Sequence, residues 1–393
     1  MAFSLNSRFW GQLPGGETVE AWTLKSPGGL ELEAITYGGI VTRLLVPDRE
    51  GHLADVVLGF NDLRSYLAGH PYFGAITGRV AGRIKGAQFD LEGKTYQLVR
   101  NDPPNHLHGG LSGFDKKIWT ATPMAARGGE CSLRLDYRSL DGEEGYPGTV
   151  DVSVTYTLTS DNTFVIETEA VTDTPTPFNL THHSYFNLAG EASGSITGHE
   201  LQIDSDQYVV TDEHMTLLGR YASVVGQSND FRKGQRLGAA IPQLFRNHGD
   251  LYRIRKPSAD HPSHELVSAA RLVDPDTGRA LNISTTESHL QLYISAALDG
   301  SLVGKSGVPY VKHAAVCLEC HGYPDGANAT SFCDNILRPG LPRRHITKYA
   351  FSTVDIDRTS TTRLENLHGT EEYSRVNAVA NFASSRTHFG SQL

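Results

Sequence analysis

Runs of alternating apolar and polar residues recur along most of this chain. Between residues 131 and 168, two such runs flank the turn-like sequence DGEEGYPG, and a third run, FVIETEAV, follows. Alternation with a period of two is typical of strands that bury one face, so the region predicts an antiparallel hairpin and a further strand. Residues 89–99 predict another hairpin, with its turn at Glu92-Gly93. Helical signals are brief, at 62–67 and 371–382, and we expect an all-β fold with few short helices.

Composition supports this expectation and excludes some classes of partner. The 393 residues include 40 glycines, and 39% of the chain is hydrophobic, which suits a large core with many tight turns. A net charge of -9 without a Lys/Arg cluster argues against nucleic acid and anionic membranes as partners. The chain has no signal peptide or membrane-length apolar run, so we expect a cytoplasmic protein, a monomer or homodimer. After Phe351 the alternation ends, which predicts one domain over residues 1–355 and a polar extension over 356–393.

The stretch Pro177–Gly190, PFNLTHHSYFNLAG, places two adjacent histidines in an apolar, aromatic-rich run. Its alternation predicts the next strand of a meander, in which His182 and His183 point to opposite faces. A histidine held in this way is either a hydrogen-bonded core residue or a catalytic group. The pattern alone leaves both interpretations open.

A glycine-rich segment, PYFGAITGRVAGRI, contains Arg79 and Arg83. Glycines allow close approach of a ligand, and a guanidinium offers it a planar fork of donors. Structural ion pairs are the alternative for both arginines.

The next segment, NDPPNHLHGGLSGFDKKIW, has the composition of a loop that carries binding groups. If its backbone is extended, His106 and His108 share a face. A two-histidine metal site is an alternative here, although no third ligand is obvious nearby.

Two carboxylates and a cysteine pair complete the candidates. Asp250 lies in a loop just before the run LYRIR, where an Asp is most often a turn-maker or a cap. Glu319 follows the apolar run AAVCL at the end of an expected buried strand, where its pKa would be shifted. Cys317 and Cys320, with His321 beside them, have the spacing of a zinc or redox motif but lack a second pair.

Together these segments resemble one family, the aldose 1-epimerases or galactose mutarotases. The similarity extends over about residues 8–353. The motifs that carry it are, in chain order, YFGAITGRVAGRI, NHLHGGLSGFDKKIW, DGEEGYPG, NLTHHSYFNLAG, CLECHGYPDGAN and RPG. The resemblance implies a large antiparallel β-sandwich of the galactose mutarotase type. It also implies an enzyme that interconverts the α and β anomers of a free aldose by acid/base ring opening and reclosure.

The resemblance also assigns roles position by position. Glu319 matches the family's general base, His183 its general acid, and His108 the histidine that contacts the sugar near its ring oxygen. The positions that match sugar-binding residues are Arg83, Asp250 and Asn105. The implied partner is a small monosaccharide, and neither a metal nor a cofactor is implied, since one acid and one base suffice for this reaction.

Several neighbours of these residues depart from the family pattern. The departures are Gly82 and His182 in place of Asn, Leu251-Tyr252 in place of His-Asn, and Cys320-His321 in place of Thr-Gln. We therefore leave open which aldose is preferred. The alternatives are a non-catalytic carbohydrate-binding or regulatory protein on the same fold, and a glycoside hydrolase. A hydrolase usually needs two carboxylates, whereas these motifs offer one Glu and two His.

Overall fold

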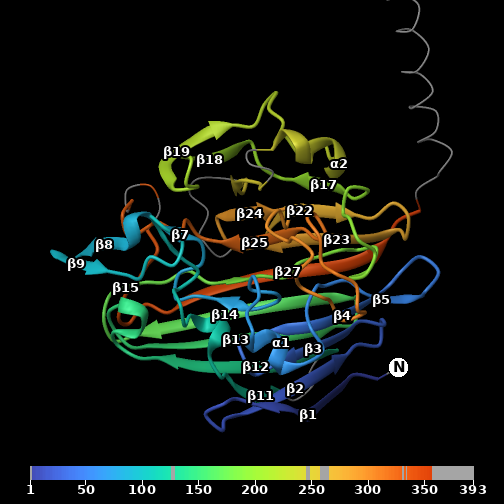
Figure 1. Cartoon of the computed structure of the whole chain (residues 1–393), viewed down its shortest axis with the longest axis horizontal. Coiled ribbons are helices and arrows are strands. Elements are labelled where there is room, and N and C mark those ends of the chain that lie inside the picture. Colours follow the sequence, from blue (N-terminus) through green and yellow to red (C-terminus); the bar gives the residue numbers. More distant parts are fainter. Residues whose placement is uncertain are drawn as a thin grey trace, which may run out of the picture. The chain divides into compact units, whose positions relative to one another are not determined.

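We describe the protein from a computed structural model, which covers residues 2–124, 129–244, 248–256, 265–329, 332 and 334–355. Residues Met1–Val354 form one compact unit. The extension predicted over 356–393, with its helical signal at 371–382, lies outside the described residues. The fold is made mostly of strands, as predicted (Figure 1).

The largest sheet has nine strands among the described residues, each antiparallel to its neighbours. In sheet order they are β11 (Thr120–Met124), β12 (Glu130–Ser139), β13 (Val150–Thr159), β14 (Thr163–Thr172), β27 (Arg343–Thr353), β23 (Arg279–Thr285), β22 (Val267–Val273), β17 (Glu200–Ile203) and β20 (Gln235–Arg236). The hairpin predicted from alternation is confirmed as β12 and β13, and β14 is the predicted third strand.

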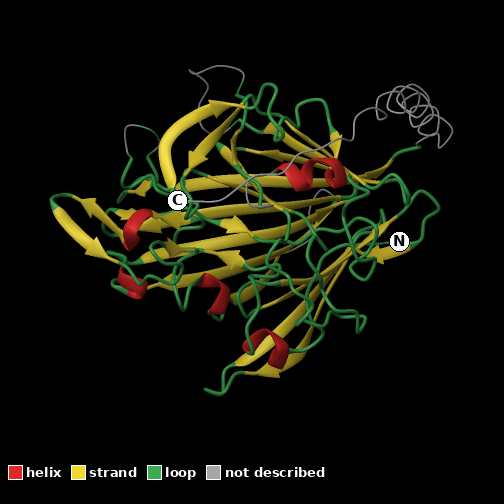
Figure 2. Cartoon of the chain, turned by 45° about the horizontal axis from the view of Figure 1, so that its top comes forward, coloured by secondary structure: helices red, strands yellow, loops and turns green. Residues whose placement is uncertain are grey.

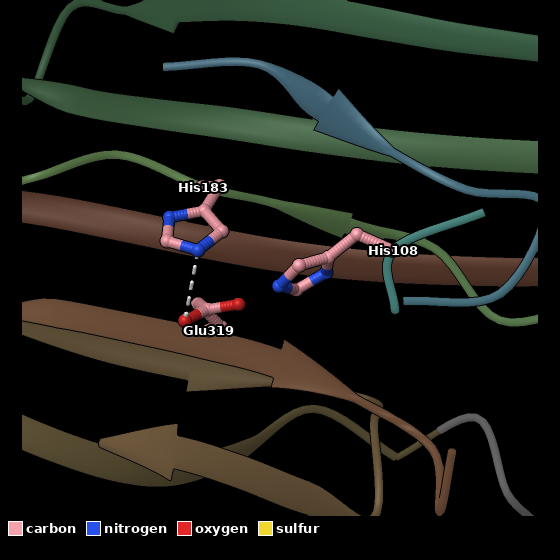
Figure 3. Close-up of side chains that lie close together, drawn as sticks. All are labelled: His108, His183 and Glu319. Carbon is pink, nitrogen blue, oxygen red and sulfur yellow. Dashed lines mark ion pairs between the residues drawn. The ribbon is translucent and has the colours of Figure 1, made fainter. Parts of the chain in front are cut away.

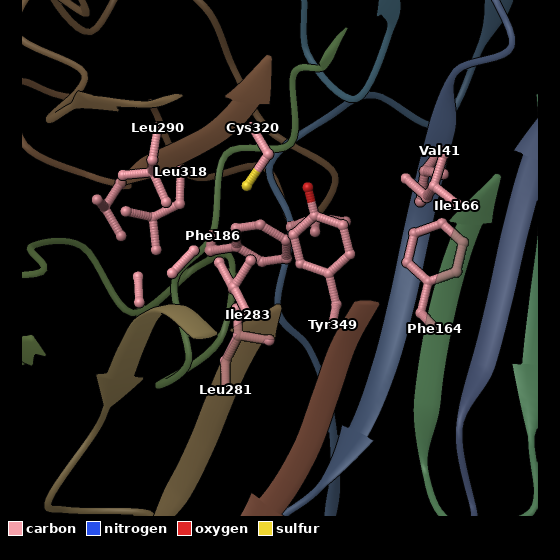
Figure 4. Packing of buried hydrophobic residues seen from close by; sticks show 14 of the residues in the cluster. Val41, Phe164, Ile166, Phe186, Leu281, Ile283, Leu290, Leu318, Cys320 and Tyr349 are labelled. Carbon is pink, nitrogen blue, oxygen red and sulfur yellow. The ribbon is translucent and has the colours of Figure 1, made fainter. Parts of the chain in front are cut away.

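Two five-stranded sheets pack against this large sheet. The first, in order, contains β1 (Ser4–Gln12), β2 (Thr18–Lys25), β3 (Glu31–Ile35), β4 (Val41–Pro47) and β5 (Leu53–Asp55). The second contains β19 (Leu217–Ser223), β18 (Gln207–Thr211), β21 (Leu251–Arg253), β24 (His289–Tyr293) and β25 (Cys317–His321). Buried side chains of all three sheets belong to one hydrophobic cluster, in which Leu318 of β25 lies beside Leu290 of β24 (Figure 4). Burial of apolar area at ~25 cal/mol per Å² holds such layers together, and the predicted β-sandwich is the result.

Short elements join and cover the sheets. Four small strand pairs are β7 (Arg83–Ile84) with β10 (His106–Leu107), β15 (Thr176–Pro177) with β26 (Ile336–Leu337), β16 (Thr181–His182) with β6 (Ile76–Thr77), and β8 (Gln88–Leu91) with β9 (Lys94–Gln97). The last pair confirms the hairpin predicted at Glu92-Gly93. Helices are few and short (Figure 2), namely α1 (Leu63–Leu67), α2 (Leu237–Ala240) and the 3₁₀ turns η1 (Lys85–Ala87), η2 (Phe114–Lys116), η3 (Glu143–Gly145) and η4 (Ile241–Gln243). Among the described residues, no helix has the length and apolar character needed to cross a membrane.

The prediction that Pro177–Gly190 is the next strand of the meander is wrong. The second neighbour of β14 is β27, from the far end of the chain, and the stretch itself forms only two two-residue strands. Residues 176–188 are all buried. A meander strand exposes one face, whereas this segment is covered on both sides and crosses the interior between sheets. Its histidines therefore lie in the core and not on an outer sheet.

Candidate active site

Three of the predicted residues come together in the interior of the fold (Figure 3). His108 follows β10, His183 follows β16, and Glu319 lies in β25. One nitrogen of each imidazole and one carboxylate oxygen all lie within 4.8 Å of one another. The shortest approach joins Nε2 of His183 to Oε1 of Glu319 at 3.5 Å. We call His108, His183 and Glu319 the acid-base trio.

Glu319 is the central residue of β25, whereas the sequence had placed it at the end of a buried strand. Its side chain is only 3% exposed, and its Oε2 atom has no hydrogen-bond partner among the described residues. Burial raises the pKa of this carboxyl from 4.5 to about 8, and the nearby Arg83 guanidinium opposes the rise. An unpartnered buried carboxylate oxygen is costly, which indicates a position that a hydroxyl group of a ligand is meant to contact.

His183 is fixed by its own backbone and by aromatic neighbours. Its N–H donates to the carbonyl of Ala75 and its carbonyl accepts from Gly74, both at 2.9 Å. Tyr72 and Tyr185 lie nearly parallel to its imidazole, with ring centroids at 5.8 and 5.1 Å. Burial lowers the pKa of His183 from 6.5 to about 3. Burial thus shifts the two pKa values in opposite directions, and each shift favours the neutral form of its group. As a result, the pair holds a single proton over a wide pH range.

The backbone at His108 is not extended, because its φ of 50° lies in the left-handed region. The condition on which His106 and His108 were expected to share a face is therefore not met. His106 instead bonds the carbonyl of Val99 and the hydroxyl of Tyr146, at 2.8 and 2.9 Å, and supports the loop. Nδ1 of His108 accepts a hydrogen bond from the Gly82 N–H at 3.2 Å. The neutral ring therefore carries its proton on Nε2 and can donate it to a ligand.

The trio has a donor set that some catalytic zinc sites use. However, a metal-bound histidine normally donates its other N–H to an acceptor, whereas Nδ1 of His108 accepts a bond from a backbone N–H. A metal on Nε2 would displace the proton that this bond places there. The arrangement therefore suits proton transfer better than metal binding.

The cysteine pair does not form a site. Cys317 and Cys320 are three residues apart in an extended strand, so their side chains point to opposite faces. They pack in two different hydrophobic clusters, and His321 bonds the carbonyl of Gly322 at 2.6 Å. A zinc or redox interpretation of this motif is wrong for geometric reasons.

The two arginines have different environments. Arg79 is buried, and its guanidinium bonds the carbonyls of Pro147, Gly148 and Leu140, which is a structural role. Arg83 lies near the trio, and its Nε donates to Oδ2 of Asp102 at 2.7 Å. The alternative of a structural ion pair therefore applies to Arg83, at the margin of the candidate site, whereas carbonyl groups hold Arg79.

Asp250 and Asn105 are both buried, but their side chains bond differently. Leu251 pairs with Gln291, which pairs with Glu319, so Asp250 lies next to the row that contains the trio's carboxylate. Its Oδ2 accepts from Asn229 at 2.9 Å, and burial raises its pKa. It is not the cap of any helix that the structure describes. Asn105 donates to Oγ1 of Thr216 at 2.9 Å and accepts from the Gly86 N–H. Its amide ties the loop to its surroundings.

Among the departures from the family pattern, Gly82 has a direct structural explanation, and the positions of several others are clear. Gly82 has a φ of 80°, and a Cβ there would lie 2.4 Å from Cγ of Pro324. His182 and Cys320 line a small internal cavity of about 30 Å³. Nε2 of His182 has no hydrogen-bond partner among the described residues. Leu251 and Tyr252 are buried. These last two replacements pack in the core.

Four residues near the trio were not singled out from the sequence. Tyr72 lies 4.6 Å from the ring of His108, and its φ of 63° is rare for an aromatic residue. Gln291 is the cross-strand partner of Glu319 and so shares its face of the sheet. The other two are Asp102 and His248. Burial and the Arg83 charge lower the pKa of His248 to about 4. Only the register of strands and the path of loops bring these residues together, and no local sequence signal marks them.

Comparisons with known proteins agree with this geometry. The family described as aldose 1-epimerase matches residues 20–350. Human galactose mutarotase is 42% identical over 350 residues, covering 89% of this chain and 99% of the human protein. The aldose 1-epimerase of Escherichia coli is 31% identical, over 86% of this chain and 96% of its own. A solved aldose epimerase homologue from C. elegans has a TM-score of 0.77 at 28% identity, covering 89% of this chain and 100% of its own. The chain therefore belongs to the aldose 1-epimerase family.

Proposed function

We propose that this protein is an aldose 1-epimerase that interconverts the α and β anomers of a free aldose. The observation that carries the proposal is the pair of His183 and Glu319, a buried imidazole and a buried carboxylate 3.5 Å apart. Membership of the family supports it, as do relatives named galactose mutarotase and aldose 1-epimerase.

In the proposed reaction, Glu319 accepts the proton of the anomeric hydroxyl while His183 donates a proton to the ring oxygen. The bond between C1 and the ring oxygen breaks, and the open aldehyde forms. Rotation about C1–C2 followed by the reverse proton transfers closes the ring on the other face. One proton enters and one leaves, so the pair returns to its starting state, and each transfer contributes about 10²- to 10⁴-fold to the rate.

The number of protons on the pair matches this exchange. The raised pKa of Glu319 and the lowered pKa of His183 leave one proton on the pair between about pH 3 and 8. The reactive form, with carboxylate and imidazolium, has the same number of protons as the neutral form. Burial favours the neutral form, so the bound sugar would have to stabilise the carboxylate and the imidazolium as the proton moves from Glu319 to His183.

We propose that the remaining residues position the sugar. His108 would donate its Nε2–H near the ring oxygen, and Arg83 and Asp250 would bond hydroxyls. Asn105, whose amide is engaged by Thr216, would act by holding the loop that carries His108. The mechanism uses neither a metal nor a cofactor.

The sugar is proposed to be a hexose such as galactose, because several relatives are named galactose mutarotase. None of the comparisons favours a non-catalytic carbohydrate-binding protein, and the trio contains a single carboxylate, which does not suit a glycoside hydrolase. A cytoplasmic location and a monomeric or homodimeric state are also proposed; cell fractionation and light scattering would test them.

Polarimetry tests the function directly. Freshly dissolved α-galactose, α-glucose and α-xylose should reach their equilibrium rotation faster with the protein, and the final rotation should be unchanged. Glu319→Gln should remove the acceleration, while exposed Glu50→Gln is the matched control and should retain it. Failure of the native protein with every common aldose would contradict the proposal, and full activity of Glu319→Gln would refute the assignment of the base.

A further inference from the structure

Arg83 reaches the candidate site with its side chain already paired. Its Nε donates to Oδ2 of Asp102 at 2.7 Å, and the two side chains are 17% and 34% exposed. Among the described residues, neither terminal guanidinium nitrogen of Arg83 has a hydrogen-bond partner, in contrast to Arg79, whose terminal nitrogens bond several carbonyls. The pairing with Asp102 thus fixes the plane of the Arg83 guanidinium and leaves two nitrogens for a ligand.

The loop that carries Asp102 is rigidly attached to the strand that carries Arg83. β7 and β10 pair through Arg83 with Leu107. The Asn101 side chain donates to the carbonyls of Leu107 and Gly110 and accepts from the Leu107 N–H. Asp102 and Asn105 exchange two backbone hydrogen bonds. One loop thereby holds both Asp102 and His108, so the carboxylate is set before any ligand binds.

The pair lies within electrostatic reach of the trio and of its aromatic neighbour Tyr72. Burial raises the pKa of Glu319, and the charge of Arg83 opposes that rise. Burial and the His183 charge lower the pKa of His108, and the Arg83 charge adds to this. Burial and the Asp115 charge raise the pKa of Tyr72, and the Asp102 charge adds to this. Both members of the pair therefore act electrostatically on residues of the candidate site.

We propose that Asp102 is a positioning residue that aims the Arg83 guanidinium at sugar hydroxyls remote from the anomeric carbon, and that the pair sets the affinity for the sugar. This inference rests on the proposed function. Two guanidinium N–H donors and the remaining oxygen of Asp102 form a set of donors and acceptors side by side. Two neighbouring hydroxyl groups, each able to donate and accept, are the ligand chemistry that such a set fits. Asp102 does no proton transfer, so it affects binding more than turnover.

Kinetics of Asp102→Asn provide the first test. The neutral amide keeps the size of the side chain and removes the charge, so KM for galactose should rise about 3- to 20-fold while kcat stays within about twofold. Asp102→Glu keeps the charge and should recover part of the affinity. The matched control is Asp136→Asn, which breaks a similar exposed ion pair of 2.9 Å with Arg134 on β12. This control should change neither KM nor kcat. A fall in kcat with unchanged KM would overturn the proposal.

A double-mutant cycle tests whether Asp102 acts through Arg83. Asp102→Asn in an Arg83→Gln background should have almost no further effect on KM, because the group that it positions is gone. Equal effects of Asp102→Asn in both backgrounds would overturn the inference. Thermal melting of each variant shows that the fold is retained.

Binding without turnover separates this inference from the proposed function. Calorimetry in the Glu319→Gln background measures galactose affinity, which should still fall when Asp102→Asn is added. This loss of affinity should be smaller for galactose analogues that lack one ring hydroxyl. If the native protein fails to mutarotate sugars but binding depends on Asp102, the function is wrong and the inference stands. If mutarotation occurs and the affinity for galactose does not depend on Asp102, the function stands and the inference is wrong.

Discussion

Glu319→Gln should stabilise the fold at alkaline pH while it removes the proposed base. Burial raises the pKa of Glu319 from 4.5 to about 8. Between these values the folded protein binds a proton that the unfolded chain releases, so this residue makes the free energy of unfolding fall as pH rises. The shift is about 3.5 units at ~1.4 kcal/mol each, which gives an upper bound of about 5 kcal/mol above pH 8. Glutamine, which is neutral and similar in size, avoids this loss.

The assay is urea denaturation of the native protein and Glu319→Gln at pH 5, 7 and 9, followed by tryptophan fluorescence. The difference between the two free energies of unfolding should be small at pH 5 and grow to a few kcal/mol in favour of the variant at pH 9. Glu50→Gln, at a side chain that is 72% exposed, should give a small difference at every pH. A difference for Glu319→Gln that does not grow with pH would refute the raised pKa and the proton inventory built on it.

Three further predictions follow from the same geometry. The value of kcat/KM should fall as pH rises through about 8, because the pair of Glu319 and His183 then loses its last proton; a flat profile to pH 10 would contradict this. His183→Asn should reduce turnover far more than His182→Asn, since His182 lines an internal cavity and does not belong to the trio. A larger loss of turnover in His182→Asn would exchange the roles of the two histidines. Gly82→Ala should lower stability by about 1–3 kcal/mol, because its φ is 80° and its new Cβ would meet Pro324 at 2.4 Å; an unchanged melting temperature would contradict the strain.

Local patterns predicted the hairpins well, because alternation and turn residues lie within a few positions of one another. The pair β8 and β9 and the pair β12 and β13 both follow from such short-range signals. The meander strand predicted at Pro177–Gly190 is wrong, because this segment is covered on both faces. Alternation of polar and apolar residues therefore does not indicate which strands are its neighbours. Its two short strands pair with β26 and β6, and the place beside β14 is taken by β27, which lies near the end of the described chain.

The site shows the same division between local and long-range information. A buried carboxylate at Glu319 was predicted from its apolar flank, and the family resemblance selected His183 and His108. The left-handed φ of His108 cannot be read from alternation, so the sequence did not show that the extended backbone needed for a face shared with His106 is absent. Asp102 has no motif of its own, and only the fold of its loop reveals its bond to Arg83.

The most direct test of the central claim is magnetisation exchange between the anomeric protons of a sugar at equilibrium. Native protein added to galactose should produce α–β exchange cross-peaks at a rate proportional to its concentration, without changing the α:β ratio. Neither Glu319→Gln nor His183→Asn should produce them above the uncatalysed rate. Exchange that is unaffected by the native protein, or equally fast with both variants, would contradict the assignment of His183 and Glu319 as acid and base.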